Sequence, residues 1–243
     1  MRSPSGMPER RSPGPTLAPN QTDSMTGPVV WVARHGQTQW SVAGRHTSRT
    51  DVPLTAVGEQ EAVALGTMLR EEHFDLVESS PRQRALRTAE LAGFEPSVDN
   101  DLVEWDYGEL EGLTTDQIKA RYPGWSIWHG PWPGGETDEQ VAARADRVVH
   151  RALALPPGAK ALLFAHGHLL RVLAARWLGQ SPASGRFFML STGTLSVLGW
   201  ERGGAAVERW NVPAGPALSS GAAPRSAAAP RSAADPAPAP GTQ

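Results

Sequence analysis

Two histidines far apart in the sequence each follow a short apolar run. His35 stands in Arg34-His35-Gly36, directly after "PVVWVA", and His166 opens a His-Gly-His triplet after "AKALLFA". A third run is followed by several arginines between positions 82 and 87. Imidazoles and guanidinium groups gathered in one place would form a pocket rich in hydrogen-bond donors and cations. Such a pocket suits a tetrahedral anion such as a phosphoryl group.

The nucleophile in such a pocket is expected to be an imidazole. The chain has no cysteine, and it lacks the G-x-S-x-G elbow of serine hydrolases. It also lacks a P-loop and a G-x-G-x-x-G motif, so nucleotide-dependent transfer has no support. His166 and His168 form an H-x-H pair, but alternate residues at a strand end point apart and no third ligand is nearby in the sequence, so no metal site is expected.

Strand-like and helix-like segments alternate along the chain. Strands are expected at 28–34, 74–80 and 159–168, with a closing pair in "TLSVLGWE" and "AAVERWNV"; helices are expected at 55–72, 82–93, 136–155 and 169–179. This alternation predicts an α/β fold, a three-layer sandwich with helices on both faces of a mostly parallel sheet. Ligands bind such sheets at the carboxyl ends of the strands, where both histidines fall. Residues 105–135, rich in Trp, Gly and Pro, are expected to be irregular.

The predicted domain spans residues 28–212. Residues 1–27 and 213–243 are mixtures of Pro, Ser, Gly and Ala without apolar periodicity, so both are expected to be disordered tails. A formal net charge of −2 gives no field that would attract nucleic acid or an anionic membrane. Because neither a secretory signal nor an 18-residue apolar run is recognisable, a cytoplasmic protein is expected.

Five segments resemble, in order and spacing, the motifs of the histidine phosphatase, or phosphoglycerate-mutase-like, superfamily. They are "RHGQTQW", "TDVPLTAVGEQEA", "SSPRQRALRTAEL", "LVEWDYGELEG" and "AHGHLLRVL". The resemblance covers about residues 29–212 and is greatest to small bacterial acid phosphatases with the motif "EWDYG". It implies a phosphoglycerate-mutase-like fold and a phosphomonoesterase that acts on small phosphate esters without metal or other cofactor.

The resemblance also implies a role for five side chains. His35 would take the phosphoryl group on a ring nitrogen, while Arg34, Arg84 and His166 would hold the phosphoryl oxygens. Glu104 would protonate the leaving oxygen and then activate water.

Alternatives remain for two of these roles. Spacing alone leaves Arg82 and Arg87 as competitors of Arg84, and Asp106 as a substitute for Glu104. His168 is interpreted as structural, and no role is assigned to the remaining histidines, at positions 46, 73, 129 and 150.

The chain departs from the family pattern at two positions. Ser41 stands where Asn is usual after R-H-G-x-T-x-W, and Gln37 replaces a common Glu. Ser41 is assigned to substrate binding, although its hydroxyl replaces a phosphate-contacting amide. Neither change removes a core catalytic group.

The segment after Glu104 bears on the substrate. Between Glu104 and Glu136 the only cations are Lys119 and Arg121, whereas the mutases of the family add a basic insertion; water is therefore the expected acceptor. The same segment holds four tryptophans, which are expected to form an apolar wall that favours aromatic or bulky alcohols: Trp105, Trp125, Trp128 and Trp132. The alternative for these tryptophans is packing of an irregular segment onto the core.

Three functions are therefore compared. The first is a metal-independent phosphomonoesterase that works through a phosphohistidine. The second is a cofactor-dependent phosphoglycerate mutase, and the third is a catalytically weak protein that binds a phosphorylated ligand. Assembly as a homodimer is left open.

Overall fold

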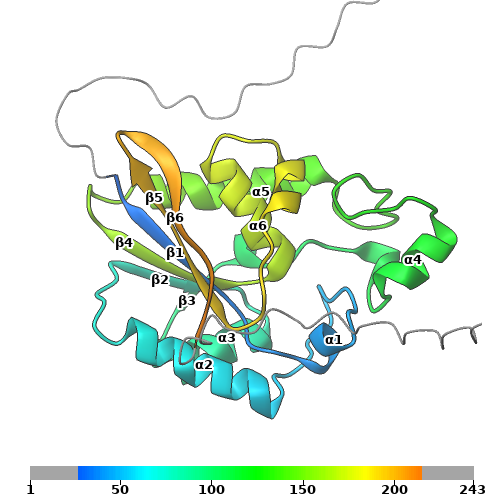
Figure 1. Cartoon of the computed structure of the whole chain (residues 1–243), viewed down its shortest axis with the longest axis horizontal. Coiled ribbons are helices and arrows are strands. Elements are labelled where there is room, and N and C mark those ends of the chain that lie inside the picture. Colours follow the sequence, from blue (N-terminus) through cyan, green and yellow to red (C-terminus); the bar gives the residue numbers. More distant parts are fainter. Residues whose placement is uncertain (1–26, 215–243) are drawn as a thin grey trace, which may run out of the picture.

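A computed structural model of the chain describes residues 27–214 (Figure 1). The tails expected at 1–27 and 213–243 lie outside this range except for their innermost residues. Within it, a six-stranded sheet has the order β3-β2-β4-β1-β5-β6. The strands are β1 Val29–Arg34, β2 Leu76–Ser79, β3 Ser97–Val98, β4 Lys160–Ala165, β5 Thr194–Glu201 and β6 Gly204–Pro213. The first four run parallel, and β5 and β6 form an antiparallel pair joined to β1.

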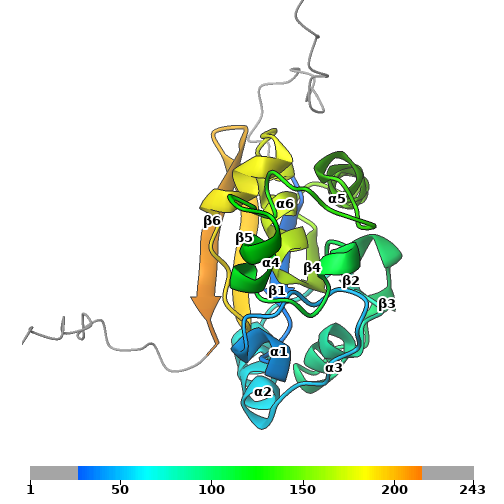
Figure 2. The same ribbon diagram turned by 90° about the vertical axis from the view of Figure 1, so that its right-hand side faces the viewer.

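Helices cover both faces of the sheet (Figures 1 and 2). The α-helices are α1 Gln39–Val42, α2 Ala56–Leu69, α3 Gln83–Leu91, α4 Thr115–Arg121, α5 Asp138–Leu153 and α6 Gly167–Trp177. Short 3₁₀ helices are η1 Asn100–Leu102, η2 Gly108–Leu110 and η3 Pro182–Phe187. Among these elements no helix is long and apolar enough to cross a membrane.

Alternation of side chains along β1 explains the three layers. Val30 and Val32 point into the core that contains α5 and α6, whereas Trp31 and Ala33 point into the core that contains α2 and α3. A strand that is buried on both faces reads as a continuous apolar run, as this one does. The predicted α/β sandwich with a mostly parallel sheet is confirmed.

The strand register brings three chain segments to one edge. Arg34 at the end of β1 pairs with Ala165 at the end of β4, and the His35 N–H donates to the Ala165 carbonyl at 3.0 Å. The Ser80 N–H, just after β2, donates to the Phe164 carbonyl at 2.9 Å. The carboxyl ends of β1, β2 and β4 therefore meet, which is where ligands bind such sheets.

Two expected boundaries differ from the structure. β4 ends at Ala165 and α6 begins at Gly167, so His168 lies in the first turn of a helix instead of on a strand. Residues 105–135 are not wholly irregular, because α4 forms there. Thr114 starts it with a capping box, in which its side chain accepts the Gln117 N–H and the Gln117 side chain accepts the Thr114 N–H.

Candidate active site

The rings of His35 and His166 lie next to each other at the edge where the strands end. Their centroids are 5.2 Å apart and their planes are inclined by 57°. Both side chains are buried. At this separation one phosphoryl group can contact both imidazoles.

The geometry of His35 leaves one ring nitrogen free to react. Nδ1 lies 2.8 Å from the Gly36 carbonyl oxygen, to which it donates a proton, so the lone pair is on Nε2. Burial, together with the charges of Arg34 and Arg84, holds the pKa of His35 well below its usual range. The ring is therefore neutral at neutral pH.

Two glycines allow the loop that carries His35 to lie directly against α2. A Cβ on Gly36 would lie 2.2 Å from the Gly58 carbonyl oxygen, and a Cβ on Gly58 would lie 2.1 Å from the Gln37 carbonyl oxygen. The loop is further fixed by the Gly36 N–H, which donates to Thr88 Oγ1 at 3.0 Å. Side chains at either glycine would push the loop away from the helix.

His166 has one engaged and one free nitrogen. Its Nε2 lies 2.7 Å from Ser80 Oγ, whereas its Nδ1 is buried and has no hydrogen-bond partner among residues 27–214. Burial is the main cause that lowers the pKa of His166 well below its usual range, and the nearby charges of Arg84 and Arg34 act in the same direction. The ring is therefore neutral as well.

Two arginines supply positive charge without a carboxylate partner in the described part of the chain. Arg34 donates through Nη1 to the Leu190 carbonyl, and its Nε is buried without a partner within residues 27–214. Arg84 is fully buried, and its Nε is likewise unpartnered there. Its terminal nitrogens donate to the carbonyls of Thr47 at 3.2 Å, Ser48 at 3.1 Å and Thr50 at 3.0 Å. Buried charges are normally paired, so these two indicate a site for an anion.

Glu104 is held at the N-terminus of α6. Its carboxylate accepts the N–H groups of His168 at 3.0 Å and Leu169 at 2.8 Å, both in the first turn of that helix. The Trp105 N–H donates to Oε1 at 2.8 Å. The helix N-terminus favours negative charge, and the three donors fix the orientation of the carboxylate beside the cavity.

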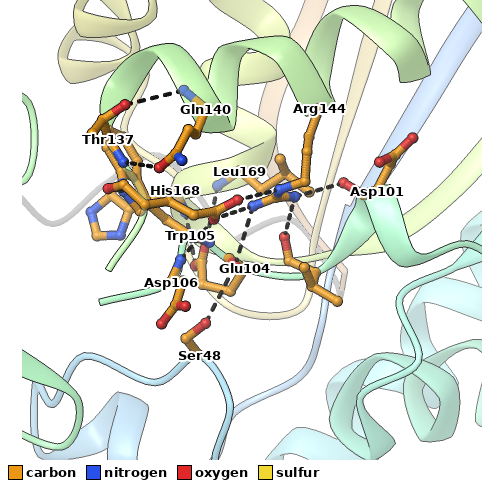
Figure 3. A network of polar contacts seen from close by, with 12 residues as sticks. Ser48, Asp101, Glu104, Trp105, Asp106, Thr137, Gln140, Arg144, His168 and Leu169 are labelled. Carbon is orange, nitrogen blue, oxygen red and sulfur yellow. Dashed lines mark hydrogen bonds and ion pairs between the residues drawn. The ribbon is translucent and has the colours of Figure 1, made fainter. Parts of the chain in front are cut away.

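Arg144 of α5 holds the segment that carries Glu104 (Figure 3). Its Nε and Nη2 each donate to Glu136 at 2.7 Å. Its Nη1 donates to the carbonyls of Asp101 at 2.8 Å and Val103 at 3.0 Å, and Nη2 lies 3.4 Å from the Glu104 carbonyl. This positioning role was not predicted, because sequence does not show that α5 packs on residues 101–104.

Two of the three competitors considered for catalytic roles lie away from the cavity. Asp106 forms an ion pair with Arg49 and accepts the Gly108 N–H, so it is turned toward its own loop. Arg87 is exposed and pairs with Glu90 at 3.2 Å. Neither Asp106 nor Arg87 is among the described residues that line the cavity. Arg82 has a buried Nε without a partner among residues 27–214 and, like Arg84, does not line the cavity, so cavity lining does not separate these two arginines.

A cavity of about 380 Å³ opens beside His35. Arg34, His35, Ser41 and Glu104 line it, whereas Arg84 and His166 are fully buried and do not line it. The Ser41 hydroxyl is already engaged, since it donates to the Thr38 carbonyl at 2.8 Å and accepts the Thr38 N–H at 2.9 Å.

The tryptophans divide between the cavity and the core. Trp125 and Trp128 line the cavity. Trp105 is fully buried and donates to the Glu136 carbonyl at 2.9 Å, and Trp132 stacks on it with centroids 5.8 Å apart. The expected substrate wall of four tryptophans is therefore corrected: Trp105 and Trp132 anchor the segment to the core, as irregular segments require.

Several further polar side chains line the cavity. Tyr107 places its hydroxyl 2.6 Å from Nδ1 of His168, and the His46 ring lies parallel to the His168 ring at 5.9 Å. His46 and His168 therefore stand in the cavity wall. The triplet His166-Gly167-His168 was the available signal for the second of them, but it indicates cavity exposure only once α6 is known to begin at Gly167.

A model of the histidine phosphatase superfamily (branch 1) matches residues 30–213. The chain belongs to this superfamily. The acid phosphatase of Mycobacterium tuberculosis is 42% identical over 173 residues, which are 70% of this chain and 85% of the relative. A probable phosphoglycerate mutase of Salmonella choleraesuis is 31% identical over 193 residues, 75% of this chain and 90% of the relative.

A solved structure of a Mycobacterium tuberculosis open reading frame is also similar. It superposes with a TM-score of 0.75 at 38% identity and covers 77% of this chain and 98% of that one. Together with the family match, these similarities identify the histidine phosphatase described here as a phosphatase enzyme.

Proposed function

We propose that this histidine phosphatase hydrolyses small phosphate monoesters through a phosphohistidine at Nε2 of His35, without a metal ion. The observation that carries the proposal is the pair of neutral imidazoles, with ring centroids 5.2 Å apart, beside Arg34 and Arg84, which have no carboxylate partner among residues 27–214. A phosphoryl dianion supplies the missing charge and accepts from the unpartnered nitrogens.

In the first step, the Nε2 lone pair of His35 attacks phosphorus, and the bond from phosphorus to the ester oxygen breaks. Glu104, carrying the proton that it took from water in the preceding cycle, gives that proton to the leaving oxygen, so the alcohol departs neutral. Arg34, Arg84 and His166 stabilise the charge on the phosphoryl oxygens as the transition state forms.

In the second step, water hydrolyses the phosphohistidine. Glu104, now a carboxylate, takes a proton from the water, whose oxygen attacks phosphorus. The bond between phosphorus and nitrogen breaks, inorganic phosphate leaves, and Nε2 regains its lone pair. Enhancements of up to ~10²¹ are reached for this class of reaction, so the whole set of groups must contribute.

The lowered pKa of His35 also supports an acid-phosphatase-like enzyme. The ring stays unprotonated as the pH falls through the usual range for an imidazole, so the nucleophile persists in mildly acidic solution. Among residues 27–214, no cluster of three or more His, Asp or Glu is suited to hold a metal ion.

The test is a rapid-quench experiment with a ³²P-labelled aryl phosphate and EDTA present. We expect an acid-labile label on the protein, lost in His35→Ala and kept in the control His150→Ala, which removes an exposed imidazole of α5. Release of phosphate without any labelled protein would overturn the phosphohistidine, and loss of activity with EDTA would overturn metal-independence.

The mutase alternative is separated by its product. With 3-phosphoglycerate, the proposed enzyme releases inorganic phosphate, whereas a mutase forms 2-phosphoglycerate and needs 2,3-bisphosphoglycerate. A protein that only binds phosphorylated ligands would release neither product.

A further inference from the structure

Three cations stand in the cavity wall in addition to the groups assigned to the phosphoryl group. They come from separate segments: Arg45 from the loop after α1, Lys119 from α4 and Arg171 from α6. None of the three forms an ion pair with an acidic side chain of residues 27–214 that would neutralise it.

Acidic side chains are scarce in the same wall. Glu104 is the only Asp or Glu among the described lining residues, and its carboxylate already accepts three backbone N–H groups. The chain as a whole has a formal net charge of −2, so the positive cavity is a local property. One phosphoryl group facing Arg34 and Arg84 leaves the other three cations unmatched.

Arg171 is built into the wall in a fixed orientation. Its guanidinium lies 4.6 Å from the Trp128 ring centroid, a cation–π contact. Nε donates to the Gly185 carbonyl at 3.1 Å and Nη2 to the Arg186 carbonyl at 3.3 Å, while Nη1 has no partner among residues 27–214. A half-buried guanidinium held in this way has donors left for a ligand and loses little freedom on binding it.

Arg45 and Lys119 stand at the exposed part of the wall. Arg45 donates through Nη1 to the Gly112 carbonyl at 3.3 Å, and its guanidinium lies 5.9 Å from the Trp40 ring centroid. Lys119 makes no side-chain hydrogen bond within the described residues. Exposed cations each contribute modestly to binding, but several of one sign in a cleft concentrate the field on an anion.

We propose that Arg171, Arg45 and Lys119 form a second anion subsite, and that the enzyme prefers phosphate esters that carry a further carboxylate or phosphate on the alcohol. This inference rests on the proposed function, because it concerns the leaving group of the same reaction. It differs from the preference for aromatic alcohols expected from the tryptophans, since Trp128 serves as a stacking surface for Arg171.

The test compares esters that differ only in the second anionic group. One pair is 3-phosphoglycerate and glycerol 3-phosphate, which probes a carboxylate; the other is fructose 1,6-bisphosphate and fructose 6-phosphate, which probes a phosphate. Release of inorganic phosphate gives kcat/KM for each. In at least one pair, we expect kcat/KM to be about tenfold higher for the ester that carries the second anionic group, which is the gain that a charge-assisted contact provides. The advantage should shrink as the salt concentration rises from about 0.05 M to about 0.5 M.

Variants assign this advantage to the proposed residues. Arg171→Gln should reduce it about threefold, and so should the exposed double variant Arg45→Gln/Lys119→Gln. The matched control is Arg121→Gln, which removes an exposed cation of α4 that does not line the cavity. Hydrolysis of p-nitrophenyl phosphate should change less than about twofold in the Arg121→Gln control. Urea-unfolding midpoints equal to that of the unmodified protein report intact folding of every variant.

Equal kcat/KM within both pairs of esters would overturn the subsite. The same holds if Arg121→Gln and the subsite variants reduce the advantage alike. If no ester is hydrolysed at all, the proposed function fails separately, and calorimetric titration of the unmodified protein with the same pairs measures the preference directly. Equal Kd values for the two members of each pair would then reject the subsite.

Discussion

Acidification should destabilise this phosphatase through its two central imidazoles. His35 is 5% exposed and His166 is 0% exposed, and burial lowers the pKa of both well below the usual range. In the unfolded chain both rings take up a proton below about pH 6.5. The unfolded state therefore binds more protons than the native state, and the free energy of unfolding falls as the pH falls through that value.

The size of the effect follows from counting these rings. For each ring that stays neutral in the native state, the free energy of unfolding of the protein falls by about 1.4 kcal/mol between about pH 7.5 and about pH 5.5. His35 and His166 together give about 3 kcal/mol, which is a large part of the ~5–15 kcal/mol that stabilises a typical domain. His46 and His168, whose pKa values are also lowered by burial, act in the same direction. The pKa of Glu136 is lowered below that of an ordinary carboxyl group, so its contribution to the free energy of unfolding is lost only at a pH below that interval.

Urea unfolding followed by tryptophan fluorescence, in phosphate-free buffers at the two pH values, measures this loss. The double variant His35→Asn/His166→Asn should lose about 3 kcal/mol less than the unmodified protein over the same interval. Val63→Ala, which trims an exposed side chain of α2, is the control for substitution itself and should keep the full loss. Equal losses in the double variant and the unmodified protein would refute the assignment of neutral, buried rings.

Three further outcomes are expected. Glu104→Gln should slow hydrolysis of an alkyl phosphate by about 10²–10⁴-fold. With p-nitrophenyl phosphate, whose leaving group needs no proton, the same variant should release p-nitrophenol in a burst of one equivalent; a steady rate without a burst would contradict the two-step role of Glu104. Arg144→Met should cost about 3–5 kcal/mol in urea unfolding, since it removes the charge partner of Glu136 and the donor to the carbonyls of Asp101 and Val103; a loss below about 1 kcal/mol would show that the network does not hold this segment. Gly58→Ala would place a Cβ 2.1 Å from the Gln37 carbonyl oxygen, so the free energy of unfolding should fall by about 1–3 kcal/mol and kcat should fall as well. Val57→Ala, on the same helix, should leave kcat unchanged. Equal effects of the two variants would argue against the close approach of the loop to the helix.

The central part of the fold follows from physical rules that act on sequence. Strands buried on both faces are apolar, and β1 and β4 are apolar except for one terminal residue each, Arg34 and Lys160. Once these strands are parallel, their carboxyl ends coincide, so the nearness of His35 and His166 follows from topology without any measured distance. The register Arg34 to Ala165 only makes this expectation quantitative.

The walls of the cavity do not follow from such rules. Composition reveals that tryptophans are concentrated after Glu104, but which of them face the cavity depends on the path of the loop. Trp105 and Trp132 stack in the core and Trp128 faces the cavity, although all three have the same chemical character. A count of cations within that segment also missed Arg45, which comes from the loop after α1.

The arrangement of charge around His35 has a consequence for how substrate is selected. A carboxylate placed beside Arg34 and Arg84 would stabilise the empty site, but a phosphoryl group would then have to displace it. Here the acidic side chain in the described cavity wall, Glu104, is tied to the N-terminus of α6, so the arginines keep their charge for the ligand. Burial and, after it, the same charges keep the pKa of His35 low, and a bound dianion opposes the effect of the charges. In the proposed mechanism, binding therefore makes the imidazole more basic when phosphorus lies next to Nε2.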